Sequence, residues 1–256
     1  MSSLFDIKDP DNKILLERLA DAKRIAVLTG AGISAESGLA TFRGESGIWS
    51  KLRPEELANM DAFLRNPERV WEWYQYRRDV LDSAKPNPGH LALAEWEQLC
   101  SEFSLITQNV DGLHQAAGSK NVIELHGNLQ VNRCQRCGSE SDVRDIRFEG
   151  KVPTCDCGGM LRPGVVWFGE MLPEAAIMNA FIAAESCDLF IAVGTSAVVY
   201  PAAMLPAEAK KHRAIVLEIN PEPTPITQWA DFSIQENAGS ILPNIVNAIK
   251  EQLNKD

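Results

Sequence analysis

The chain has 256 residues, 45% of them hydrophobic, and a formal net charge of −10. This length can bury a full core without disulfide support, and the acidic balance argues against a general nucleic-acid-binding protein, which needs a basic face. No apolar run reaches the ~18 residues of a membrane span, and the N-terminal segment MSSLFDIKDPDNK lacks the features of a signal or transit peptide. We therefore expect a cytoplasmic protein with no membrane partner and no direct nucleic-acid partner.

The predicted elements alternate between helices and short apolar strands. A helix over 11–22 precedes a buried strand at 25–28, which runs into the glycine turn TGAG. Further strands are expected at 103–107, 122–125, 165–168, 189–193, 215–219 and 232–234, and further helices at 67–83, 88–100, 173–185, 201–211 and 239–253. This alternation predicts an α/β fold, a Rossmann-like doubly wound parallel sheet.

Two stretches, 41–83 and 132–163, interrupt the alternation, and we expect them to form a smaller domain. The first is a helical insertion and the second a zinc ribbon. The larger domain would then consist of 1–40, 84–131 and 164–256. A cleft between two such domains is where a ligand is expected to bind.

Four cysteines in the second stretch have the spacing of a structural zinc site. They form the pairs Cys134-x-x-Cys137 and Cys155-x-Cys157. Zinc prefers four tetrahedral ligands, and an all-thiolate site is structural rather than catalytic. The second pair is shorter than the commoner Cys-x-x-Cys. The alternative is a cluster of buried or redox-active cysteines.

The turn after the first strand, Gly30-Ala31-Gly32-Ile33-Ser34-Ala35, fits the pattern G-x-G-x-x-G/A. Glycines in such a loop let the backbone approach a pyrophosphate, and a following helix N-terminus favours its charge. The second strand that usually carries a ribose-binding acid is missing. The pattern therefore favours a dinucleotide handled differently from hydride transfer, with a purely structural glycine turn as the alternative.

Several motifs together resemble the sirtuins, NAD-dependent protein-lysine deacylases. They are GAGISAESGLATFRG at 30–44, TQNVDGLH at 107–114, ELHG at 124–127, the cysteine module, VWFGE at 166–170, GTS at 194–196 and Asn220-Pro221. They occur in family order and cover roughly residues 13–250. The resemblance implies NAD as co-substrate, one structural zinc ion, and acylated lysine side chains of proteins as the substrate.

The resemblance also implies roles for individual residues. His126 would be the general base on a ribose hydroxyl, a role that suits a pKa near neutral, and Asn109 would assist it. Without the ELHG context, His126 would be interpreted as a core histidine. The implied NAD-binding residues are Gly30, Ala31, Gly32, Ser34, Ala35, Thr41, Phe42, Arg43, Trp49, Gln108, Asn109, Asp111, His126, Gly194, Thr195, Ser196, Asn220, Pro221, Glu222 and Ala238. The implied peptide-binding edge comprises Val165, Val166, Trp167, Phe168, Gly169 and Glu170.

The segment WEWYQYRR at 71–78 bears on the acyl group. On a helix, Tyr74 and Arg77 lie at i and i+3 and share a face, where an arginine fork and a tyrosine hydroxyl can bind a carboxylate. Tyr-x-x-Arg resembles the class III sirtuins, which prefer succinyl, malonyl or glutaryl groups, and Ala58 matches a position where a small residue widens their pocket. The alternative is a solvated helix face, and Tyr76 or Arg78 could substitute if the register differs.

Three functions remain to be distinguished. The first is an NAD-dependent deacylase that removes acetyl and also succinyl or malonyl groups; a plain deacetylase without acidic-acyl preference is a variant of it. The second is a mono-ADP-ribosyltransferase, which breaks the same glycosidic bond. The third is a non-enzymatic NAD sensor or zinc-ribbon binding module. The set of motifs around His126 favours the first.

Overall fold

A computed structural model describes residues 10–42, 47–48, 53–146 and 148–254. Its larger sheet has six parallel strands in the order β3-β2-β1-β7-β8-β9. The strands are β1 (Arg24–Thr29), β2 (Glu102–Thr107), β3 (Val122–Glu124), β7 (Leu189–Val193), β8 (Ile215–Ile219) and β9 (Phe232–Ile234). The strand order reverses between β1 and β7, so ligands are expected where the loops after these two strands diverge. The predicted Rossmann-like fold is confirmed.

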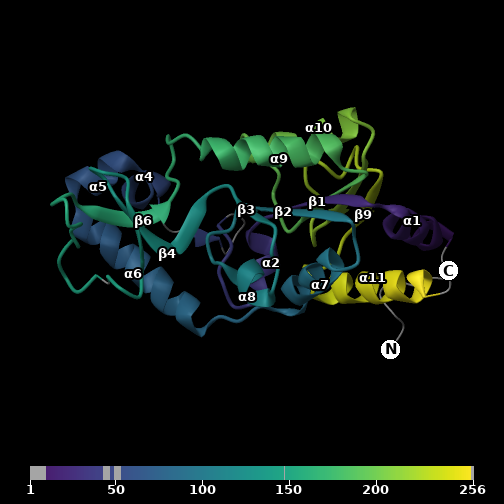
Figure 1. Cartoon of the computed structure of the whole chain (residues 1–256), viewed down its shortest axis with the longest axis horizontal. Helices are drawn as coiled ribbons and strands as arrows, with labels where there is room; N and C mark the ends of the chain where they lie inside the picture. Colours follow the sequence, from purple (N-terminus) through teal and green to yellow (C-terminus); the bar gives the residue numbers. More distant parts are fainter. Residues whose placement is uncertain (1–9, 43–46, 49–52, 147, 255–256) are drawn as a thin grey trace.

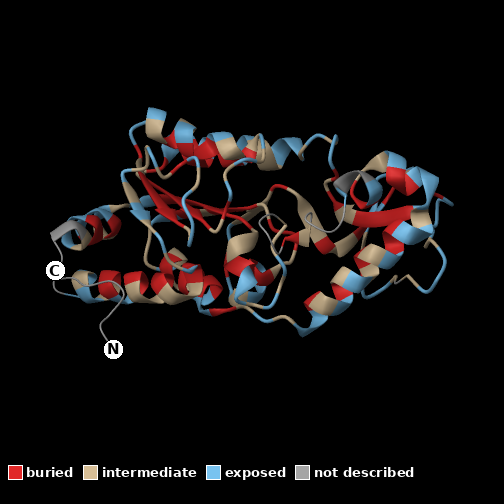
Figure 2. Cartoon of the chain, turned by 180° about the vertical axis from the view of Figure 1, so that it is seen from behind, coloured by how far each residue is buried: buried red, intermediate tan, exposed pale blue. Residues whose placement is uncertain are grey.

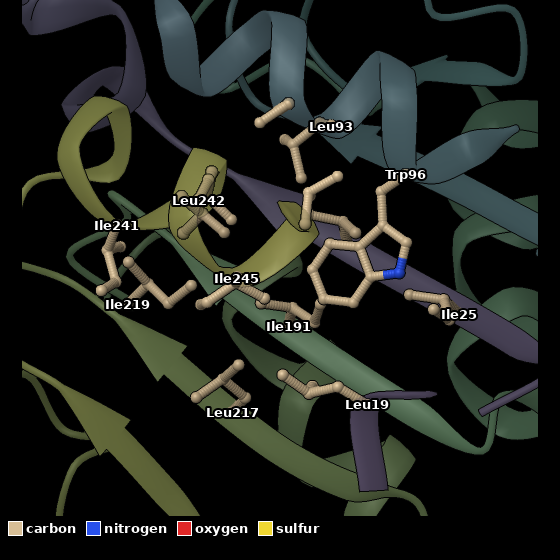
Figure 3. Close-up of a cluster of buried hydrophobic side chains, with 14 of the residues drawn as sticks. Leu19, Ile25, Leu93, Trp96, Ile191, Leu217, Ile219, Ile241, Leu242 and Ile245 are labelled. Atoms are coloured by element: carbon tan, nitrogen blue, oxygen red, sulfur yellow. The ribbon is translucent and has the colours of Figure 1, made fainter. Parts of the chain in front are cut away.

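Helices cover both faces of this sheet (Figure 1). One face carries α1 (Pro10–Asp21), α7 (Pro88–Glu97) and α11 (Ala238–Leu253), and the other carries α9 (Glu174–Ser186) and α10 (Leu205–Lys211). Figure 3 shows the first interface, where Trp96 of α7 lies over apolar side chains of the sheet and of α11. The central strands β1, β7 and β8 are almost wholly buried (Figure 2), which explains their nearly continuous apolar sequences.

A smaller lobe lies beyond one end of the sheet (Figure 1). Its antiparallel sheet has the order β5-β4-β6, with β4 (Gly127–Cys134), β5 (Glu140–Asp142) and β6 (Leu161–Val165). Its helices are α4 (Pro54–Leu57), α5 (Met60–Arg65) and α6 (Pro67–Ser83). The apolar faces of these elements form a core of their own. The antiparallel sheet extends beyond 132–163 at both ends, and the expected domain division stays a prediction.

One predicted strand was wrong. The apolar run 165–168 was expected to join the parallel sheet, but β6 ends at Val165 and pairs antiparallel with β4. After β6, the side chain of Trp167 packs into the core of the small lobe, whereas Phe168 is 49% exposed. Burial of alternate side chains therefore produced an apolar run without a strand.

Two helix starts near the site are set by asparagine caps. Asn66 accepts a hydrogen bond from the Arg69 backbone N–H, and Pro67 opens α6 with a backbone already suited to a helix. Asn87 caps α7, and His90 completes a capping box by accepting from the Asn87 backbone N–H. None of the helices in the described part of the chain combines the length and apolarity that crossing a membrane requires.

Candidate active site

The glycine loop meets the end of β7 at the reversal of strand order. The N–H of Gly30 donates to the carbonyl of Val193 at 3.1 Å, and that of Gly32 to Gly194 at 2.8 Å. A Cβ on Gly32 would lie 2.7 Å from Gly194 Cα, a distance that real Cβ atoms do not adopt. Close approach of two backbones thus requires these glycines whether or not a phosphate is bound. The helix that follows, α2 (Ala31–Ala35), is short.

Three of the predicted polar residues form one hydrogen-bonded group. Ser34 Oγ donates to Asp111 Oδ2 at 2.7 Å, and Asn109 Nδ2 donates to Ser34 Oγ at 3.1 Å and to the carbonyl of Gly30 at 3.0 Å. Asp111 also accepts from the Leu113 N–H at 3.0 Å. Two loops far apart in sequence are therefore locked together at the site. The serine and the aspartate already bind each other, a pairing that the sequence alone did not reveal.

Two buried histidines lie beneath this group. His90 and His114 have ring centroids 4.8 Å apart, and His114 Nε2 is 2.9 Å from the hydroxyl of Thr29. Burial lowers the pKa of His114 to about 3 and that of His90 to about 4. Both rings are therefore neutral at neutral pH.

His126 has the geometry of a general base. Its Nδ1 lies 2.9 Å from the carbonyl oxygen of Gln108. A carbonyl can only accept, so Nδ1 carries the hydrogen and Nε2 keeps a free lone pair. Burial lowers the pKa of His126, while the bond to Gln108 acts against this. The ring is therefore neutral, oriented and able to take a proton at neutral pH.

A cavity of about 340 Å³ opens beside Asn109 and Asp111 and extends to α6. Arg77 lines it, and its Cζ lies 5.0 Å from the ring centroids of both Phe42 and Trp73. Such stacking favours the guanidinium, which stays charged at neutral pH although burial lowers its pKa. No acceptor among the described residues hydrogen-bonds to this guanidinium. A cation in a largely apolar cavity is thus left able to bind an anion.

Tyr74 lies beside Arg77, whose Cζ is 5.6 Å from the tyrosine ring centroid. The tyrosine is only 2% exposed, and burial raises its pKa. Its hydroxyl oxygen accepts a hydrogen bond from Trp167 Nε1 at 2.8 Å. No described residue accepts the hydroxyl proton itself. The predicted shared face is confirmed, and among the described residues neither the Arg77 guanidinium nor the Tyr74 hydroxyl proton has an acceptor.

The neighbouring candidates have other environments. Arg78 is 2% exposed and donates to the carbonyls of Leu129 and Val131, so it fastens α6 to β4 instead of facing a ligand. Tyr76 is 66% exposed and also lines the cavity. Ala58 is buried, and its carbonyl accepts from the Phe168 N–H at 2.9 Å. The register therefore places Arg77 at the cavity, with the buried Tyr74 beside it.

The four cysteines of the ribbon come together. Their sulfur atoms all lie within 4.8 Å of one another, with Cys134 and Cys157 at 3.5 Å and Cys137 and Cys155 at 3.8 Å. Thiolates bound tetrahedrally to zinc at ~2.3 Å would stand ~3.8 Å apart, so the set fits one structural zinc ion. The short Cys155-x-Cys157 pair does not prevent this.

The remaining NAD-binding candidates lie around the same edge of the sheet. Gln108 Nε2 donates to Thr195 Oγ1 at 2.9 Å, which joins the loops after β2 and β7. Ser196 is exposed, whereas Ala238 at the start of α11 is buried. The other described candidates are Ala31, Ala35, Thr41, Gly194, Asn220, Pro221 and Glu222. Arg43 and Trp49 lie outside the described residues.

A doubly wound sheet with a glycine loop at the reversal of its strand order, and an oriented histidine base in the loop after β3, is typical of a dinucleotide-dependent enzyme. Residues 30–201 match the Sir2 family. The chain therefore belongs to the Sir2 family, the sirtuins, and is an NAD-dependent enzyme.

Similar proteins agree with this placement. The chain is 53% identical to an NAD-dependent protein deacylase of Aquifex aeolicus, over 89% of this chain and 96% of that protein. It is 48% identical to an NAD-dependent protein deacylase of Mycobacterium tuberculosis, over 88% and 98%. Among solved structures, a Sir2 homologue with NAD has a TM-score of 0.89 at 48% identity, covering 94% of each chain. A complex of Sir2, a p53 peptide and NAD+ has a TM-score of 0.82 at 33% identity, covering 98% and 100%.

Proposed function

We propose that this NAD-dependent protein deacylase removes acidic acyl groups, such as succinyl, malonyl or glutaryl, from lysine side chains of proteins, in addition to acetyl groups. The observation that carries this proposal is the pair of donors without acceptors, Arg77 and the hydroxyl of Tyr74. Arg77 is half-buried and lines the cavity, so its guanidinium is open to an anion that enters there. An acyl carboxylate is such an anion, because it accepts from a guanidinium fork and a hydroxyl together.

An acetyl group offers no negative charge to this cavity. Its methyl group would leave Arg77 and Tyr74 without acceptors, whereas a succinyl carboxylate would use both. A charge-assisted hydrogen bond contributes about 1.5–3 kcal/mol, so loss of one such bond predicts a preference of roughly 10-fold to 100-fold for the acidic group.

The catalytic steps would fall to His126, to Asn109 and to Phe42, of which the last two line the cavity. NAD supplies the bond between nicotinamide and ribose that breaks, and its ADP-ribose portion receives the acyl group. His126 Nε2 would take the proton of a ribose hydroxyl, with Nδ1 held by the Gln108 carbonyl. Asn109 would hydrogen-bond the ribose or an ordered water, and Phe42 would exclude bulk water from the reacting carbon.

The peripheral assignments belong to the same proposal. The segment 165–170 would bind substrate backbone, with Phe168 and Gly169 exposed at its end. The six cysteines are free, which supports a reducing, cytoplasmic compartment. The division into a larger NAD-binding domain and a small zinc domain is supported by the separate apolar core of the small lobe.

The experiment compares kcat/KM for succinyl-lysine and acetyl-lysine versions of one peptide. The wild-type enzyme should prefer the succinyl peptide, and Arg77→Met should abolish that preference. Arg69→Met is the matched control, because Arg69 lies on α6 but pairs with Glu56 at 3.3 Å. Mass analysis should find O-acyl-ADP-ribose. ADP-ribose attached to protein would indicate a transferase instead. Equal use of both peptides, unchanged by Arg77→Met, would refute the acidic-acyl proposal.

A further inference from the structure

The indole of Trp167 connects the segment 165–170 with Tyr74, the neighbour of Arg77 on α6. Its Nε1 donates to the hydroxyl oxygen of Tyr74 at 2.8 Å, although the two residues are 93 positions apart in the sequence. The indole is 2% exposed, so it contacts neither solvent nor the surface on which a peptide would lie. The side chain of Trp167 therefore makes its contacts inside the small lobe, even if the backbone of this segment binds the substrate peptide.

The direction of this hydrogen bond follows from chemistry. An indole N–H can only donate, so the oxygen of Tyr74 must accept. A tyrosine hydroxyl that accepts from one side directs its own proton elsewhere, and hydrogen bonds in a chain strengthen one another. Without Trp167, the hydroxyl could rotate freely.

We propose that Trp167 is a positioning residue that sets acyl specificity by holding the Tyr74 hydroxyl as a donor toward the acyl carboxylate. This inference rests on the acidic-acyl function proposed above. It assigns to Trp167 a role that acts through Tyr74 and requires no contact between the indole and the substrate.

The indole is itself held on several sides. The Cζ of Arg162 lies 3.3 Å from the Trp167 ring centroid, and the ring of Phe63 has its centroid 5.3 Å away. Arg162 forms an ion pair with Glu170 through both terminal nitrogens of its guanidinium, Nη1 and Nη2. Glu170 in turn accepts from the Trp167 backbone N–H at 2.8 Å. The Nε1 direction is thus fixed by a buried cation and its carboxylate, not by the ligand.

The same segment is fastened to the catalytic side. The N–H of Val166 donates to the carbonyl of His126 at 2.8 Å, and that of Phe168 donates to the carbonyl of Ala58 at 2.9 Å. Trp167 lies between the two residues, Val166 and Phe168, that make these backbone hydrogen bonds. The acyl donors and the general base therefore share one rigid connection, which would keep the carboxylate subsite at a constant distance from the reacting carbonyl.

The test is a double-mutant cycle read as the ratio of kcat/KM for succinyl-lysine and acetyl-lysine peptides. Trp167→Phe keeps an aromatic ring against Arg162 but removes the N–H donor together with part of the buried indole, a loss of packing that the control below shares. One net hydrogen bond corresponds to a change of about fivefold, so we expect the ratio to fall at least threefold, mainly through a higher KM for the succinyl peptide. In a Tyr74→Phe background, Trp167→Phe should change the ratio no further.

Trp71→Phe is the matched control. The Trp71 indole is equally buried and donates to the carbonyl of Leu161 at 3.0 Å, so it loses a similar bond that does not touch Tyr74. It should lower the melting temperature and leave the ratio unchanged. A change below threefold in Trp167→Phe, or an equal fall in the Tyr74→Phe background, would overturn the inference.

Failure of the inference is distinguishable from failure of the proposed function. If Arg77→Met abolishes the succinyl preference and Trp167→Phe does not reduce it, the function stands and the role of Trp167 is wrong. If the wild type shows no preference, both are wrong. Should Trp167→Phe fail to fold, the indole ¹⁵N–¹H resonance of Trp167 in the wild type, assigned from variants of the other tryptophans, replaces it. This resonance should shift more with the succinyl peptide than with the acetyl peptide, and equal shifts would overturn the inference.

Discussion

Replacing Gly32 by alanine tests how the nucleotide loop is built. The added Cβ would lie 2.7 Å from both the Cα and the carbonyl oxygen of Gly194, so the loops after β1 and β7 would have to separate. Overpacking of this kind costs ~1–3 kcal/mol, which in a protein of this size corresponds to a melting temperature lower by roughly 2–10 °C. Because the same two loops are predicted to bind NAD, the KM for NAD should rise as well.

Thermal unfolding and steady-state kinetics would be measured on Gly32→Ala and on a control, Gly150→Ala. Gly150 has φ +83° and no atom within 4 Å of an added Cβ, so alanine there adds only backbone strain of ~1 kcal/mol. The control should lose some stability and keep the wild-type KM for NAD. The reasoning is refuted if Gly32→Ala matches the wild type in both melting temperature and KM.

Three further predictions concern the zinc site, the buried histidines and the base. Cys137→Ser should reduce bound zinc, measured by atomic emission, and lower the melting temperature; full zinc content would contradict the four-thiolate site. His90 and His114 have pKa values lowered to about 4 and about 3. Each should therefore contribute its full share to the free energy of unfolding above pH ~6.5. As the pH drops toward 4, that free energy should fall by up to ~1.4 kcal/mol per pH unit for each histidine. His114→Gln should flatten this dependence in a series of melting curves, and an unchanged slope would argue against a buried neutral ring. His126→Asn should slow deacylation by ~10²–10⁴-fold, and because burial lowers the pKa of His126, the acid limb of kcat/KM should lie below pH ~6.5; an acid limb above that pH would contradict the assignment.

Local sequence signals were sufficient for the large sheet and for the zinc ligands. The central strands β1, β7 and β8 are almost wholly buried, and β1 and β7 each end at a glycine, so these short apolar runs were recognisable from their composition. The apolar run at 165–168 was wrongly predicted to be a strand of the parallel sheet, because Trp167 is buried in the small lobe and not in that sheet. Nothing local to the sequence distinguishes these two causes of burial.

The sequence could suggest candidate site residues, but it could not give the hydrogen bonds that connect them. Tyr74 and Arg77 could be paired because i and i+3 share a helix face, and the structure places them together. The bond from Trp167 to Tyr74 and the bond from Ser34 to Asp111 join segments that only the tertiary fold brings into contact. The apolar character of Trp167 suggested a strand and gave no signal of its donor role.

The most direct test of the central claim is a structure of the enzyme with a bound succinyl-lysine peptide. We predict that the succinyl carboxylate lies in the cavity beside α6, with its oxygens about 2.7–3.2 Å from the Arg77 guanidinium and the Tyr74 hydroxyl. A carboxylate that points into solvent, with Arg77 still stacked on Phe42 and Trp73 and bound to nothing, would contradict the account.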